Sequence, residues 1–429
     1  MTGMKKLICL LLAAVLILCS AAAMAEEEGP MTIDPAADRN ITIHKAGENT
    51  VEEGMSPTTG RSLAEVAAEI PDEYKERFGG MSATGEYMPL MVQVTNYASS
   101  LGSRAPWFAS YADVIYESAK TKTGDTRFTM VYSDVLPDWV GCCRSLRVQH
   151  VWIREEWNAP FLYHGCQKND GNTLGTDVPT AIRDLGWRVP NLTSTDRVSV
   201  FFDGECRREW SSSHYRCTVL GEDNVVYYVP GIIENCVKTQ EITPRNHTCV
   251  FSDELPEGGD EATDIYVLWN KNKNGQESGA TAYYFNNLIQ YEPEENLYYR
   301  YVIRDLQHPD NAELFEELTP ENIRKEGQGT MSCKLVNGEP ITFSNIIVQF
   351  VNIEWVNGAN DQPLATLTGS GNADYFMGGM HYSGVWNRET LQERTVFYNE
   401  NGEEMPLQPG KTLIIMMDYN VDVREVRYE

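Results

Sequence analysis

The chain has 429 residues, 42% of them hydrophobic and 10% aromatic, which is enough for two or three domains that each bury a core. Asp and Glu number 62 against 35 Lys and Arg, a formal charge of −27. So large a negative charge argues against nucleic-acid binding, which needs a basic surface to displace counterions from phosphates. It also argues against docking on anionic lipid through a polybasic face.

The first 25 residues have the pattern of a secretory signal peptide. Two lysines precede an apolar run over 7–18, and the segment ends at Ala25 in a small-x-small cleavage pattern. The run is shorter than the roughly 20 residues that span a bilayer. Cys19 follows it as in a lipoprotein signal, but the bulky Leu18 stands where such signals have a small residue. We therefore expect an extracytoplasmic chain, secreted or at the cell surface, and leave lipid attachment at Cys19 open.

The segment 26–82 mixes acidic, Gly and Pro residues with little periodicity, which predicts a flexible linker or stalk. Beyond it, the patterns predict an α/β-type N-terminal domain over 83–255. Its expected elements are strands over 87–95 and 128–132, a helix over 145–157, a strand over 161–164 and a helical turn over 180–185.

The acidic, glycine-containing stretch 254–264 predicts a boundary between domains. Beyond it, helical periodicity is weak and alternating segments dominate, which predicts a mainly antiparallel β domain over 262–425. Its strands include 265–269, 296–303 and 344–353. The expected fold class is α+β in two domains.

The sequence has 10 cysteines, two of them within the first 25 residues. Outside the cytoplasm, disulfides are the default use of such a set. Spacing favours the local bridges Cys206–Cys217 and Cys236–Cys249, although sequence alone does not choose among the pairings. Cys166 is also expected in a disulfide, with a thiol enzyme that pairs it with a histidine as the alternative.

Several strings occur in a familiar order along the chain. They are ADVIYE at 112–117, G-x-x-RSxR at 141–147, FLYHG at 161–165, GSGNADYFMGG at 369–379 and FYNENGEEMPLQPGKT at 397–412. Together they resemble the YerB-like lipoprotein family, bacterial envelope proteins with N- and C-terminal domains of unknown function. The resemblance covers about residues 85–420 and implies an envelope location and a two-domain layout, without an established activity. The chain departs from the family at Cys142 and Cys143, where Pro and Val are usual, and in its degraded lipidation signal.

One group of polar residues could form a site. It comprises Arg144, Ser145 and Arg147 together with Asn96, Glu117, Arg127 and His164. If Ser145 caps the helix, the arginines lie at a helix N-terminus, which already carries partial positive charge. That arrangement is unfavourable unless an anion is bound there. The anion could be a protein carboxylate, such as Glu117 or Asp113, or a carboxylate or phosphate of a ligand.

The leading hypothesis is therefore a binding protein for an anionic small molecule, an envelope polymer or a protein partner. A binder would leave Arg144 and Arg147 in an open pocket without a saturating carboxylate. The first alternative is a hydrolase or transferase acting on envelope glycan or peptide, with His164 or Glu117 as the acid/base. The second is a structural module, in which both arginines are buried and paired.

No cofactor or metal site is expected from the sequence. The seven histidines include no H-x-x-x-H pair, and no C-x-x-C occurs.

Overall fold

The computed structural model describes residues 30–70, 87–96, 106, 108–122, 124–137, 139–168, 175–190, 201–203, 214–216, 225–229, 232, 242–270, 286–302, 340–356 and 361–429. The signal peptide predicted over 1–25 lies outside this part of the chain. Within the described ranges, no helix combines the length and apolar character that a bilayer span requires.

The first half of the chain alternates short strands with a few helices. Its elements are β1 (Met31–Thr32), α2 (Leu63–Glu69), β2 (Leu90–Thr95), the 3-10 turn η1 (Ala109–Tyr111), β3 (Val114–Ala119), β4 (Thr126–Tyr132), β5 (Trp139–Cys143), α3 (Val148–Trp157), β6 (Phe161–Tyr163), α4 (Val178–Asp184), β7 (Phe201–Asp203), β8 (His214–Arg216) and β9 (Val225–Tyr228).

The described part of the second half consists of strands. They are β10 (Asp260–Glu261), β11 (Asp264–Leu268), β12 (Asn287–Glu292), β13 (Leu297–Val302), β14 (Thr342–Phe343), β15 (Asn345–Val356), β16 (Gln362–Thr366), β17 (Gly369–Met377), β18 (Met380–Arg388), β19 (Val396–Asn399), β20 (Thr412–Asp418) and β21 (Glu425–Tyr428).

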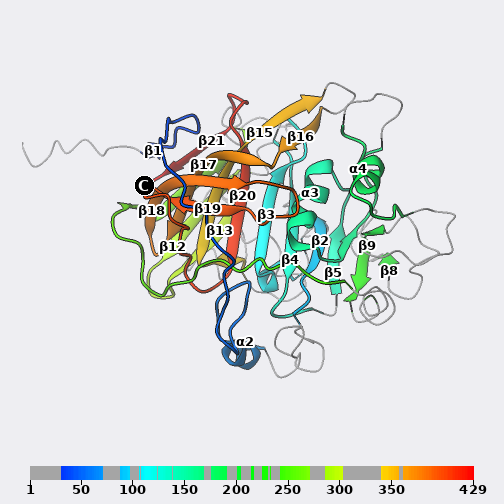
Figure 1. The fold of residues 1–429 in the computed structure, drawn as a ribbon, viewed down its shortest axis with the longest axis horizontal. Helices are drawn as coiled ribbons and strands as arrows, with labels where there is room; N and C mark the ends of the chain where they lie inside the picture. The colour runs from blue at the N-terminus through cyan, green and yellow to red at the C-terminus, as the bar shows by residue number, and fades with distance from the viewer. Residues whose placement is uncertain are drawn as a thin grey trace, which may run out of the picture.

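These strands form two sheets (Figure 1). The larger has 15 strands, in the order β10–β18–β17–β15–β20–β3–β4–β2–β5–β9–β8, with β16, β19, β6 and β7 paired beside this path. The smaller has six, in the order β1–β21–β11–β12–β13–β14. The mainly antiparallel β character of the second half agrees with the sequence prediction.

The α/β character predicted for the N-terminal domain is not confirmed. An α/β domain joins parallel strands through crossover helices. Here β4 is antiparallel to both of its neighbours, β2 and β3, the parallel pairs β2–β6 and β6–β7 involve strands of only three residues beside β2, and α3 and α4 are short. The described N-terminal half is largely sheet.

The larger sheet crosses the boundary that the sequence predicts between the two domains. Strand β20 pairs in parallel with β3 from the first half and with β15 from the second (Figure 1). Every residue of β20 and β3 is buried, as is usual for parallel strands covered on both faces. The two halves therefore share one hydrogen-bonded sheet.

Helix α3 lies against β3 and begins later than predicted. Its N-cap is Arg147 and not Ser145, because the chain stays extended through Leu146, which forms a bridge with Cys166. The helix ends at Trp157 as predicted, where Asn158 takes the left-handed conformation at φ 49°. At that end Trp157 Nε1 donates to Tyr116 Oη at 3.0 Å, which fixes α3 on the β3 strand.

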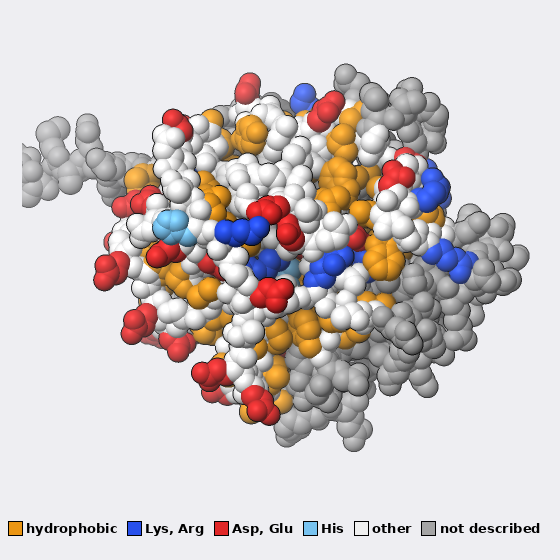
Figure 2. All heavy atoms as spheres, viewed as in Figure 1, with side chains coloured by type: hydrophobic (Ala, Val, Ile, Leu, Met, Phe, Trp, Pro, Cys, Tyr) orange, Lys and Arg blue, Asp and Glu red, His pale blue; other side chains and the backbone are white. Residues whose placement is uncertain are grey.

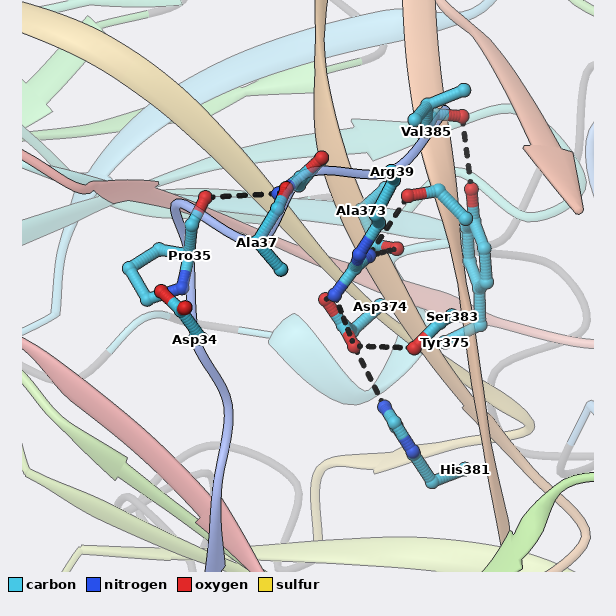
Figure 3. Close-up of polar contacts among 12 residues, drawn as sticks. Asp34, Pro35, Ala37, Arg39, Ala373, Asp374, Tyr375, His381, Ser383 and Val385 are labelled. Carbon is cyan, nitrogen blue, oxygen red and sulfur yellow. Dashed lines mark hydrogen bonds and ion pairs between the residues drawn. The ribbon is translucent and has the colours of Figure 1, made fainter. Parts of the chain in front are cut away.

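Residues 30–62, which we call the strap, lie against both halves of the chain. The Arg39 guanidinium donates to the carbonyls of Ala373 and Gly384 and to the Asp374 carboxylate, at 2.7, 2.8 and 2.8 Å. Figure 3 shows Arg39 beside Ala373 and Asp374. Further along, the hydroxyls of Ser56 and Thr59 donate to the buried carboxylate of Asp134. The flexible linker predicted over 26–82 is therefore wrong for these residues. The strap is held by single polar anchors, which leave no periodic pattern in the sequence.

The predicted disulfides find no support in the described residues. Cys142, Cys143, Cys166 and Cys249 are all reduced. The bridge expected between Cys236 and Cys249 is therefore absent, and burial raises the pKa of the Cys249 thiol to about 12. The Cys206–Cys217 pair lies outside the described residues.

Candidate functional site

Strand β3 divides the predicted site between two faces of the larger sheet. Successive side chains of a strand point to opposite faces. Glu117 accepts hydrogen bonds from Asn287 and Arg300 of the smaller sheet, whereas Ser118 Oγ lies 3.1 Å from His150 Nε2 of α3. The residues predicted as one cluster therefore form two separate sites.

Glu117 lies at the centre of the first site and is fully buried. Its carboxylate accepts from Asn96 Nδ2 at 2.8 Å, from Thr126 Oγ1 at 3.0 Å, and from Asn287 Nδ2 and an Arg300 guanidinium nitrogen at 3.4 Å. Burial raises the pKa of Glu117, and the charge of Arg300 opposes this rise. Glu117 and Asn96 thus belong together as predicted, but their cation is Arg300.

Sequence reasoning did not include Arg300 in the site. The sequence did contain a signal for a buried position at Arg300. Alternation along the strand places Arg300 on the same face as Tyr298, two residues earlier, which is buried. A charged residue at an inward-facing position of a strand requires a buried partner of opposite charge.

The second site lies at the N-terminus of α3. Arg127 of β4 pairs directly with Ser118 and so faces α3, where Arg147 is the N-cap. Burial, followed by the charges of Arg147 and Arg127, lowers the pKa of His150 well below its ordinary value. Burial and the same two arginines also lower the pKa of Lys120, which Asp125 opposes from 3.4 Å. Three cations therefore lie close together here, and one of them, Lys120, pairs with Asp125.

Arg147 is the most unusual member of this site. Its residue surface is only 8% exposed, and its guanidinium donates to the Leu146 carbonyl at 3.0 Å. The Nε–H group is buried without an acceptor, and no carboxylate of the described chain forms an ion pair with Arg147. Burial lowers the pKa of Arg147 to about 10. The adjacent Gln149 is also buried, with its Oε1 lacking a donor.

The other predicted residues lie beside α3 on a neighbouring loop. Arg144 is half-buried, and its carbonyl accepts the His164 N–H at 3.2 Å. Ser145 and His164 are half-buried as well. The structure thus places the segments that contain Arg144, Arg147 and His164 side by side.

Neither carboxylate that the sequence offered as a partner reaches the arginines of α3. Glu117 binds Arg300 on the opposite face. Asp113 accepts the backbone N–H groups of Ser133 and Asp134 at 2.6 and 3.0 Å. Burial and the nearby Asp134 raise the pKa of Asp113. In the ranges described, no three His, Cys, Asp or Glu side chains are grouped to hold a metal.

Comparisons with known proteins agree with this organisation. Two models of a family described as protein of unknown function (DUF3048) match the chain, the N-terminal domain over 79–194 and the C-terminal domain over 280–414. The crystal structure of YerB protein from Bacillus subtilis is similar in fold, with a TM-score of 0.56 and 17% identity. The match covers 87% of this chain and 99% of that one. No curated protein matches the sequence.

The Glu117–Arg300 pair generates a stability prediction. The substitution Glu117→Gln removes the negative charge and leaves Arg300 buried without compensation, so we expect a loss of about 3 kcal/mol in the free energy of unfolding. Urea denaturation monitored by fluorescence measures this loss. Glu354→Gln, at an exposed position of β15, is the matched control and should change stability little. A loss below about 1 kcal/mol for Glu117→Gln would contradict the proposed pairing.

His150 generates a prediction about pH. The folded protein holds His150 neutral, whereas the unfolded chain protonates it below pH about 6.5, so stability falls as the pH falls. Between pH 7.5 and 5.5 the wild type should lose about 1 kcal/mol more than His150→Gln. Parallel urea titrations of both proteins measure the difference. Equal losses would show that His150 takes up a proton freely in the fold.

Proposed function

The chain belongs to the DUF3048 family of proteins of unknown function, as the resemblance in its sequence predicts, and we propose that it binds an anionic ligand at the N-terminus of α3. The observation that carries this proposal is the buried guanidinium of Arg147, which has no carboxylate partner among the residues that the structure describes. An uncompensated buried charge is costly, so proteins normally pair such groups or use them to hold a ligand.

The surroundings of Arg147 add to the positive charge. Lys120 and Arg127 lie close enough to influence the same titratable groups, and Lys120 pairs with Asp125 at 3.4 Å. The first N–H groups of α3 contribute the positive end of the helix dipole. A carboxylate or phosphate would accept from the free Nε–H of Arg147, and a hydroxyl on the same ligand would donate to Gln149 Oε1.

We propose that this binding takes place outside the cytoplasm. The support is the signal-peptide pattern over 1–25 together with the charge of −27. The ligand would then be an anionic small molecule, an envelope polymer or a carboxylate of a partner protein.

The alternative functions have weaker support. A structural module requires arginines paired by Glu117 or Asp113, and both carboxylates have other partners. A hydrolase that uses Glu117 as its acid/base is disfavoured, since this carboxylate is fully buried and saturated by hydrogen-bond donors. His164 is half-buried and is the remaining candidate for such chemistry.

Replacing Arg147 tests the proposal in two ways. Without ligand, Arg147→Met should raise the melting temperature, because it removes an uncompensated buried charge. Inorganic phosphate should stabilise the wild type by RT ln(1 + [L]/Kd), about 2.7 kcal/mol at a hundredfold excess over Kd, and should not stabilise the variant. Differential scanning fluorimetry of the full chain measures both effects.

The matched control is Arg183→Gln, an exposed arginine on α4 that should leave both quantities unchanged. A lower melting temperature for Arg147→Met, together with equal stabilisation of both proteins by phosphate, would contradict the proposal.

A further inference from the structure

A polar cleft lies between the strap, the segment around Arg245 and the loop that joins β18 to β19. Its volume is about 490 Å³, which is within the usual range for small-molecule sites. Two of its walls, the strap at Lys45–Glu48 and the Arg245 segment, lie outside both family matches. The third wall, over 387–398, belongs to the C-terminal domain.

The cleft departs from the acidic character of the protein. Four Lys or Arg residues and three Glu residues line it. In the whole chain, 35 Lys and Arg stand against 62 Asp and Glu. Figure 2 shows one face of the molecule, where Lys and Arg lie across the middle together with several Asp and Glu, and further Asp and Glu follow the left and lower margins. Three of the four cations are paired, Lys45 with Glu389, Arg394 with Glu404 and Arg388 with Glu156. Arg245 is therefore the cation of the cleft that is best placed to meet an anionic ligand.

The floor of the cleft is fixed by Arg388. Its guanidinium donates to the carbonyls of Thr390, Leu391 and Glu393, which sets the shape of the loop. It also lies 3.8 Å from Glu156. Burial alone would raise the pKa of Glu156, but the charge of Arg388 and several hydrogen bonds hold it at about 2. Arg388 is therefore a structural support and has no capacity left for a ligand.

Arg245 is differently placed, because part of its guanidinium faces the cleft. Its Nε donates to the Glu155 carbonyl at 2.7 Å, and the side chain is 34% exposed. The Glu155 carboxylate lies 3.9 Å from Arg245 and is already bound by Arg154 and Trp187, at 2.6 and 2.7 Å. Arg154 and Arg245 thus share the Glu155 carboxylate. The outer edge of Arg245, which is the side of its guanidinium away from Nε and Glu155, keeps its N–H donors and part of its charge for a ligand.

The remaining available groups both donate and accept hydrogen bonds. The exposed amide of Gln392 forms no hydrogen bond within the described chain. The side-chain oxygen of Asn387 accepts no hydrogen bond from described residues, and one carboxylate oxygen of Glu393 is likewise unoccupied. Hydroxyl groups satisfy such a mixture because each one donates and accepts.

We infer that this cleft binds an acidic saccharide. Its carboxylate would pair with the outer edge of Arg245, and its ring hydroxyls would pair with Gln392, Asn387 and Glu393. The volume suits a ligand of about disaccharide size. This site is independent of Arg147, which does not line the cleft.

Isothermal titration calorimetry of the full chain at low salt tests the inference. The probe is a hyaluronan tetrasaccharide, which carries glucuronate, and chitotetraose is the neutral saccharide of the same length. We expect the acidic probe to bind and the neutral probe to bind at least about tenfold more weakly, because a hydrogen bond to a charged group contributes roughly 1.5–3 kcal/mol. Arg245→Gln should remove this preference.

Three further variants make the result specific. Gln392→Ala removes no hydrogen bond of the described chain and should weaken both probes, whereas the exposed Arg183→Gln should change neither. Arg147→Met should also bind the acidic probe with unchanged affinity. The inference fails if the wild type does not bind the acidic tetrasaccharide, or if the preference for the acidic over the neutral probe survives Arg245→Gln. It fails equally if Arg147→Met abolishes binding, since the probe would then occupy the site at α3.

Discussion

The parallel pairing of β20 with β3 is the constraint on which the rest of the structure depends. It joins strands from the two halves of the chain side by side, and both are buried along their full length. Because β3 lies inside a sheet, its two faces must each be covered, one by α3 and the other by the smaller sheet. The residues of β3 therefore determine which polar groups meet on each side.

Two adjacent residues of β3 show the consequence. Glu117 points toward the smaller sheet and is neutralised there by Arg300, which comes from the other half of the chain. Ser118 points toward α3 and contacts His150, beside Arg147 and Arg127. The first site has matched charges and holds the two layers together. In the second, Arg147 has no carboxylate partner among the described residues, and this difference is the physical basis for proposing ligand binding at α3.

The sequence predicts those features that depend on local patterns. The strands β2, β4, β6, β13 and β15 and the end of α3 at Trp157 fall close to their predicted positions. The strand β3 was not predicted, so the separation of Glu117 from Ser118 onto opposite faces, which follows from alternation along a strand, was missed with it. The pairing of Glu117 with Arg300 was out of reach of local patterns, because the two residues are 183 positions apart in sequence. The strap was hidden for a related reason, since Arg39 finds its partners more than 330 positions away.

Direct location of an anion would test the central claim, that the charge of Arg147 is completed by a ligand. Crystals of the full chain soaked in selenate, which scatters anomalously and resembles phosphate in shape and charge, would show where anions bind. The account predicts an anomalous peak within hydrogen-bonding distance of Arg147 Nε, at the N-terminus of α3. Peaks confined to exposed Lys and Arg side chains, with a protein carboxylate seated against Arg147, would contradict it.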